Sequence, residues 1–271
     1  IAEIGINHNG DIKNALKLIE EAKLAGCNAV KFQKRFPKEC VPKIMWDTTK
    51  NTPWGKMTYI KYKEKMEFNK RDYKKIIQHC KKLKLDWSAS CWDSSSVDFM
   101  ENLKIPFYKI ASASLTDLDL LKKIKKTKKP IIISTGASTM KQIKKAISIF
   151  GSKNLGILHC NSSYPAKYEE LNLKFIPKLI RMYPKSLIGY SGHEKGLSTT
   201  VAAAVLGAKI IERHITLDKA MWGTDQLASL EPMGYGRVIR DIRQIESALG
   251  EPKKIVYEGE IEVMKKLRLV N

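Results

Sequence analysis

The chain has 271 residues, 43% of them hydrophobic and 28% charged, which is typical of a folded globular protein of one large or two small domains. Its net charge of +21 comes mainly from lysine runs on helix-like segments, and without interleaved arginines and aromatics it does not indicate nucleic-acid binding. No apolar run approaches the roughly 18 residues of a membrane helix, and IAEIGINHNG has no signal-peptide features, so we expect no membrane partner.

Strand-like and helix-like segments alternate along the whole chain. Short apolar runs predict strands at 1–7, 28–32, 86–89, 107–110, 130–134, 155–159, 186–190 and 208–211. Apolar residues at helical spacing predict helices at 15–25, 71–83, 96–103, 118–126, 140–150, 173–182, 199–206 and 236–248. Eight such pairs within about 250 residues predict an α/β fold, a (β/α)8 TIM barrel.

The alternative to a barrel is a doubly wound open sheet, which rarely has eight regular repeats. No GxGxxG follows the first strand, which also disfavours dinucleotide binding. We expect residues 1–250 to form the barrel and residues 251–271 a C-terminal tail or the start of a linker. Residues 34–67 interrupt the alternation, and an insertion of this length is usually a lid or a binding loop.

Polar residues collect where the predicted strands end. In a barrel these ends face one another around the active site. The residues concerned are Glu3, His8, Lys31, Gln33, Ser90, Asp93, Lys109, Ser112, Ser134, His159, Asn161, Ser162, Tyr164, Ser191, His193 and His214. Lysines and serines suit a phosphorylated or carboxylated substrate. Neutral imidazoles bind divalent metals, so His193 and His214 on consecutive strands predict a metal site.

Each of these residues also has a structural interpretation. A histidine at a strand end is often only a hydrogen-bonding partner, and His159, within an apolar run, is expected in the core. Lys31, Lys109 and Glu3 favour function more strongly, because a buried charge requires a partner of opposite charge. The five cysteines are scattered and never in CxxC spacing, which predicts a reduced, cytoplasmic protein without a zinc ribbon.

Several motifs resemble one known family over essentially the whole chain. They are EIGINHNG (3–10), VKFQK (30–34), TPWGKMTY (52–59), YKIASAS (108–114), ISTGAS (133–138), HCNSSYP (159–165), GYSGHEKG (189–196) and ERHITLDKAMWGTDQLASLEP (212–232). The family is that of sialic acid (N-acetylneuraminate) synthases, with the legionaminate and pseudaminate synthases. The resemblance implies a TIM-barrel transferase that condenses phosphoenolpyruvate with an N-acetylated hexose and releases phosphate. It also implies a divalent metal, Mn²⁺ with Mg²⁺ as the alternative, and a homodimer is left open.

The resemblance assigns roles to individual residues. The implied catalytic residues are Glu3, Lys31, Lys109, His193 and His214, of which the two histidines would hold the metal. The implied phosphate contacts are Lys109, Ser112, Ser134 and Ser162. The implied carboxylate contacts are Lys31, Ser90 and Ser191. Gln33, Tyr164 and Asp225 would contact the sugar, and Glu3 would lie near the reacting carbons.

Two alternatives stay open at this point. Family members usually continue into a small antifreeze-like domain that supplies an arginine to the sugar, and this sequence is expected to lack it. A synthase for a phosphorylated aldose would require additional arginines, yet only Arg213 of the eight arginines lies near these motifs. The other alternative is a non-catalytic barrel that serves as a binding partner.

Overall fold

The computed structural model, which describes residues 1–270, contains a closed barrel of eight parallel strands. The strands are β1 (Ala2–Gly5), β2 (Ala29–Lys34), β5 (Asp86–Cys91), β6 (Tyr108–Ile110), β7 (Ile131–Ser134), β8 (Leu155–Cys160), β9 (Leu187–Gly192) and β10 (Ile210–His214). Their order around the barrel is β1-β10-β9-β8-β7-β6-β5-β2, and β2 pairs with β1 to close it. The predicted TIM barrel is confirmed, and the open sheet is wrong.

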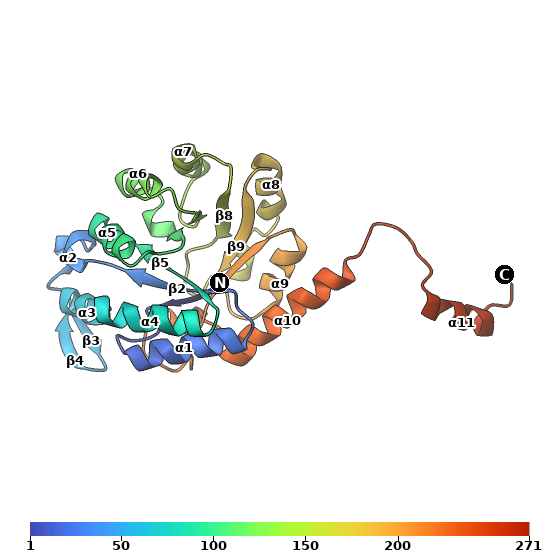
Figure 1. The fold of residues 1–271 in the computed structure, drawn as a ribbon, viewed down its shortest axis with the longest axis horizontal. Helices are drawn as coiled ribbons and strands as arrows, with labels where there is room; N and C mark the ends of the chain where they lie inside the picture. The colour runs from blue at the N-terminus through green and yellow to red at the C-terminus, as the bar shows by residue number, and fades with distance from the viewer. Residues whose placement is uncertain (271) are drawn as a thin grey trace.

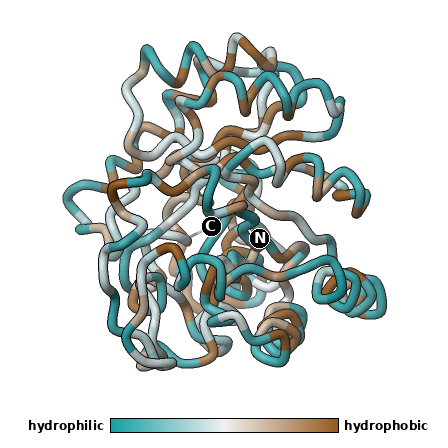
Figure 2. Tube along the Cα trace, turned by 90° about the vertical axis from the view of Figure 1, so that its left-hand side faces the viewer, coloured by the Kyte–Doolittle hydropathy of each residue, from teal (hydrophilic) through white to brown (hydrophobic). Residues whose placement is uncertain are grey.

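A helix follows each barrel strand and covers the outside (Figure 1). These helices are α1 (Ile12–Leu24), α4 (Lys70–Lys82), α5 (Ser94–Asn102), α6 (Leu118–Lys126), α7 (Met140–Phe150), α8 (Phe175–Met182), α9 (Ser198–Val205) and α10 (Pro232–Ala248). Several begin at a side chain that accepts a first-turn N–H, such as Asp11, Asn69 and Thr139. Figure 2 shows hydrophobic and hydrophilic residues alternating along the outer helices, as amphipathic helices require.

The two faces of a barrel strand serve different purposes. On β2, Lys31 and Gln33 line a cavity inside the barrel, whereas Phe32 between them points outward and packs edge-on against Tyr73 of α4. Successive side chains of a strand point to opposite faces. The same strand therefore contributes to the hydrophobic core and to the candidate site.

The first strand is shorter than the predicted range of 1–7. It ends at Gly5, whose φ of +53° is left-handed and uncommon for residues with a side chain. The chain then turns, and the Asn7 N–H donates to the Ile4 carbonyl at 2.9 Å. This early turn leaves His8 beneath the rim of the barrel, stacked on Phe68 with ring centroids 4.2 Å apart.

The segment between β2 and α4 has secondary structure of its own. It contains α2 (Pro37–Cys40), the 3₁₀ turn η1 (Lys43–Met45), the antiparallel hairpin of β3 (Thr49–Thr52) and β4 (Gly55–Thr58), and α3 (Tyr59–Met66). Its buried residues Tyr62 and Met66 form a separate small cluster with Ile6, against which Trp222 packs. The segment is therefore anchored to the loops that follow β1 and β10, at the C-terminal end of the barrel.

Helix α11 (Glu258–Leu267) lies apart from the barrel, at the end of an extended segment (Figure 1). None of its residues is buried. The division at residue 250 stays a prediction. All five cysteines are free, and within residues 1–270 no helix is long and apolar enough to cross a membrane.

Candidate active site

A cavity of about 220 Å³ opens among the C-terminal ends of the barrel strands. Most of the predicted site residues line it: Glu3, Lys31, Gln33, Lys109, Ser112, Ser134, Ser162, Tyr164, Ser191, His193 and His214. They come from seven of the eight strands or from the loops directly after them. The barrel thus brings together residues that lie more than 200 positions apart in sequence.

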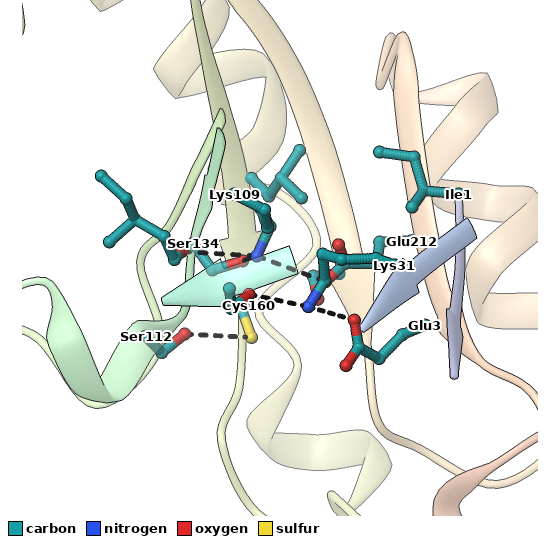
Figure 3. A network of polar contacts seen from close by, with 12 residues as sticks. Ile1, Glu3, Lys31, Lys109, Ser112, Ser134, Cys160 and Glu212 are labelled. Carbon is teal, nitrogen blue, oxygen red and sulfur yellow. Dashed lines mark hydrogen bonds and ion pairs between the residues drawn. The ribbon is translucent and has the colours of Figure 1, made fainter. Parts of the chain in front are cut away.

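Two buried lysines form the charged floor of this cavity (Figure 3). Lys31 pairs with the Glu3 carboxylate, and its Nζ donates to Ser90 Oγ at 2.9 Å. Lys109 Nζ lies 3.3 Å from Glu212 Oε1 and donates to Ser134 Oγ at 2.6 Å. At each lysine a carboxylate and a hydroxyl therefore offset part of the loss of water, and at Lys109 burial still lowers the pKa of the ammonium, with Glu212 opposing this effect.

Glu212 is a site residue that the sequence analysis does not identify. It is buried on β10, lines the cavity and accepts a hydrogen bond from Ser191 Oγ at 3.0 Å. The sequence contains a signal for it: Glu212 is an acidic residue within an apolar strand, and because it lies two positions before His214, both side chains point to the same face of the sheet. The same reasoning selects Glu3 on β1.

The two carboxylates differ in basicity although both are buried. Burial raises the pKa of Glu3 to about 7, with Lys31 opposing this effect and Glu212 adding to it. Burial acts on Glu212 in the same direction, but Lys109 and Lys31 outweigh it and lower its pKa to about 2. Near neutral pH, Glu212 is thus a fixed negative charge, and Glu3 can take up or release a proton.

Hydroxyl groups and a glycine form a small recess beside Lys109. The Gly136 N–H donates to Ser112 Oγ at 3.0 Å, and the Ser162 hydroxyl is buried without a hydrogen-bond partner. A Cβ built on Gly136 would lie 2.9 Å from Ser112 Oγ and closer still to Ser162 Oγ. The absent side chain therefore leaves space between two hydroxyls next to a lysine, which suits a phosphate group.

The two predicted metal-binding histidines face the same cavity, with ring centroids 5.3 Å apart. Burial lowers the pKa of His214 to about 3, and its Nδ1 is buried without a hydrogen-bond partner. His193 Nδ1 lies 2.6 Å from the Asn161 carbonyl, which fixes the orientation of the ring. A neutral imidazole with an unpaired buried nitrogen beside an oriented second imidazole fits a divalent metal.

Within residues 1–270, His, Cys, Asp and Glu side chains form no cluster of three with metal-binding geometry. The residues present therefore fit a two-histidine site, in which small ligands would take the other coordination positions. Cys160 lies beside this pair, with its Sγ 3.7 Å from His193 Nδ1. Burial opposes ionisation of the thiol, but His193 outweighs this and lowers the pKa of Cys160.

Two predicted substrate contacts lie outside the cavity wall. Ser90 is fully buried and accepts from Lys31, so it supports the lysine from below. Asp225 lies on the loop after β10, with Oδ2 3.8 Å from His214 Nδ1. The structure places Asp225 beside His214 and Ser90 in contact with Lys31.

Other residues singled out from the sequence have structural contacts instead. His159 is buried, with Nε2 2.6 Å from the Leu171 carbonyl, as expected for a core histidine. Arg213 is turned away from the cavity and donates to Glu194 Oε1 at 3.0 Å. The arginine next to the site is Arg35, which donates to the side-chain oxygen of Gln33. Arg213 is near the site motifs in sequence, but its side chain points to the opposite face of β10.

Comparison with known proteins adds a family and several relatives. The model of the NeuB family matches residues 18–254. The chain is 38% identical to N-acetylneuraminate-9-phosphate synthase of Mus musculus, over 98% of this chain and 75% of the mouse protein. It is also 38% identical to N,N'-diacetyllegionaminic acid synthase of Campylobacter jejuni, over 96% of this chain and 80% of that protein.

Among solved structures, the chain resembles the sialic acid synthetase of Leptospira borgpetersenii. The TM-score is 0.84 at 29% identity, over 99% of this chain and 92% of the other. The likeness therefore extends beyond the barrel strands to nearly the whole path of the chain.

Proposed function

The chain belongs to the NeuB family, and from this premise we propose that it condenses phosphoenolpyruvate with an N-acetylated sugar aldehyde, forming a sialic-type nonulosonic acid and releasing inorganic phosphate. The matched relatives are named as synthases of such acids, which supports the reaction type. The observation that carries the proposal is the cavity itself. It combines two buried lysines, a recess lined by hydroxyls and two histidines within about 220 Å³.

Phosphoenolpyruvate carries two anionic groups, and the cavity offers two cationic positions. We assign its phosphate to Lys109, with the hydroxyls of Ser112, Ser134 and Ser162 around it. The carboxylate is assigned to Lys31 and Ser191 on the other side of Glu212. Binding both ends fixes C3 of the substrate relative to the wall that bears the histidines, and such orientation accelerates bond formation.

His193 and His214 would hold the divalent metal, with Mn²⁺ as our first choice and Mg²⁺ as the alternative. When bound, the ion would supply Lewis acidity to the carbonyl oxygen of the sugar. Tyr164 packs on His193 with ring centroids 4.1 Å apart, and Gln33 faces the same space. These two side chains and Asp225 are placed to orient the sugar.

The bond changes follow from this arrangement. C3 of phosphoenolpyruvate attacks the aldehyde carbon, which leaves an oxocarbenium ion at C2. Water adds to C2, and the resulting tetrahedral centre expels phosphate by cleavage of its C–O bond. The two protons of the water end on the new hydroxyl at the former aldehyde carbon and on the phosphate. We assign the first proton that the water loses to Glu3, because a carboxyl with a pKa of about 7 can accept it near neutral pH. Glu212 remains ionised and holds Lys109 beside the departing phosphate.

The test is consumption of phosphoenolpyruvate with Mn²⁺, offering N-acetylmannosamine, its 6-phosphate and 2,4-diacetamido-trideoxyhexoses. His214→Ala should abolish sugar-dependent consumption. The matched control is His79→Ala, whose imidazole lies on α4 beside Glu20, at 3.1 Å. Wild-type protein that consumes no phosphoenolpyruvate with any of these sugars would contradict the proposal. A cytoplasmic location remains a prediction.

A further inference from the structure

Two lysines of the segment between β2 and α4 share one aromatic surface. Lys50 Nζ lies 4.5 Å from the ring centroid of Tyr62 and 5.8 Å from that of Tyr59. Lys63 Nζ lies 5.1 Å from Tyr59 and 5.3 Å from Tyr62. Cation–π contact explains why each ammonium is held there, but it does not offset the repulsion between two like charges.

The neighbouring glutamates pair with cations other than Lys50 and Lys63. Glu64 pairs with Lys38 at 3.9 Å, and Glu67 pairs with Lys34 at 3.0 Å and with Arg35 at 3.9 Å. Within the described residues 1–270, neither Lys50 nor Lys63 has a carboxylate at ion-pairing distance. Burial, together with the charges of Arg35 and Lys50, lowers the pKa of Lys63 to about 8, against the opposing charges of Asp225 and Glu67. Neither ammonium is therefore in direct contact with a carboxylate in the described chain.

A third cation, Arg35, lies between these lysines and the cavity. Its side chain is buried, donates to Gln33 and lies over the Trp92 ring at 4.1 Å from the centroid. Gln33 and Trp92 both line the cavity. Arg35, Lys50 and Lys63, which we call the cationic cluster, thus extend outward from the Gln33 side of the site.

The loop after β10 borders the cluster on its other side. Trp222 packs edge-on against Tyr62 with centroids 5.4 Å apart, and Lys50 Nζ lies 5.4 Å from the Trp222 ring. Asp225 on the same loop is beside His214 and close enough to raise the pKa of Lys63. The cluster therefore adjoins the part of the site assigned to the sugar. Lys109, which we assign to the phosphate of phosphoenolpyruvate, is on β6, and β6 lies across the barrel from β10.

We propose that the cationic cluster binds a phosphate monoester carried by the sugar substrate at the end remote from its aldehyde. The inference rests on the proposed condensation and names the class of sugar. Lys34, Arg35, Lys50 and Lys63 with Glu67 and Asp225 have a net charge of +2, which a phosphate dianion offsets. Lysines bind phosphate as point charges, whereas a neutral hydroxyl would leave both ammoniums unpaired.

The matched relatives do not decide this point by themselves. The mouse protein is named for a 9-phosphate product, and the Campylobacter jejuni protein for a product without phosphate, at the same 38% identity. From the sequence alone a phosphorylated aldose is disfavoured, because only Arg213 lies near the motifs. The structure turns Arg213 outward and supplies Arg35 with two lysines instead.

The experiment compares phosphoenolpyruvate consumption with N-acetylmannosamine 6-phosphate and with N-acetylmannosamine. We expect kcat/KM to favour the phosphorylated sugar by about a hundredfold or more, and the preference to decline as salt screens the charges. Lys50→Gln and Lys63→Gln should each raise KM for the phosphorylated sugar about tenfold, with kcat and the rate on the unphosphorylated sugar nearly unchanged. Lys63→Arg retains the charge and should retain most of the preference.

The matched control is Lys61→Gln, an exposed lysine of α3 with no ring or carboxylate contact in the described chain. Equal or better use of the unphosphorylated sugar by the wild type would overturn the inference and leave the condensation intact. A preference that survives both glutamine variants, with the control unchanged, would also overturn it. Consumption with neither mannosamine but with a 2,4-diacetamido-trideoxyhexose would overturn the inference alone, whereas consumption with none of these sugars would count against the proposed function.

Discussion

Replacing Glu212 by glutamine removes one charge from the buried floor and almost no volume. Lowering a carboxyl pKa from 4.5 to about 2 corresponds to about 3 kcal/mol of folding free energy. Removal of one partner from a buried ion pair costs about 3–5 kcal/mol. Since Lys109 keeps its bond to Ser134, and Ser191 can still donate to the amide oxygen, we expect about 3 kcal/mol for Glu212→Gln.

The pH dependence of this effect follows from the direction of the pKa change. The folded-state pKa of Glu212 is lowered, so its contribution is fully present above the unfolded value of about 4.5. It is lost as the pH falls toward about 2. The difference in unfolding free energy between wild type and Glu212→Gln should therefore be largest near neutral pH and shrink in acid.

The assay is urea denaturation at pH 7 and at pH 4, followed by tryptophan fluorescence. Lys109→Met and the double variant Lys109→Met/Glu212→Gln complete a double-mutant cycle. We expect the double variant to be less destabilised than the sum of the single changes, because neither charge is left alone. A cost below about 1 kcal/mol for Glu212→Gln at pH 7, or strictly additive single changes, would refute the reasoning.

Three further predictions concern other parts of the structure. Arg213→Met should destabilise the fold by about 3–5 kcal/mol in urea and leave the KM for phosphoenolpyruvate unchanged, because the guanidinium pairs with buried Glu194 away from the cavity. Gly136→Ala should weaken phosphoenolpyruvate binding about tenfold or more by calorimetry, with little change in stability, because its methyl group would force the hydroxyls of Ser162 and Ser112 to rotate out of the recess. Near-wild-type affinity would contradict this. A bound anion raises the pKa of Glu3 above about 7, so phosphoenolpyruvate binding at pH 8 should take up a proton, and binding enthalpies that agree between Tris and HEPES would refute it.

The barrel could be predicted from the sequence because its signal is local and repeated. Each strand is a short apolar run, since a parallel strand is buried on both faces, and each helix shows its own apolar stripe. Residues such as Lys31 and Lys109 stand out because they interrupt these runs with a charge. The rule that strand ends meet at one rim then groups them without further information.

The points at which the structure differs from the sequence-based expectations depend on the direction of individual side chains. Proximity in the sequence does not determine that direction. Arg213 lies next to His214 in the chain, yet adjacent residues of a strand face opposite sides of the sheet. Glu212 shares the face of His214 and was passed over. Arg35 lies beyond the end of β2, and its position beside Gln33 depends on how the following segment folds back over the barrel.

The pairing of each floor lysine with a carboxylate also has a consequence for turnover. The lysines are buried and paired before substrate arrives, so an incoming anion competes with Glu3 and Glu212 for them. One molecule that carries both a phosphate and a carboxylate can bind both lysines at once. Its second contact then forms at a high effective concentration, which strengthens binding. After cleavage the two anions are on separate molecules and lose that advantage. The same carboxylates that pair with the lysines in the empty site then compete with the products for them.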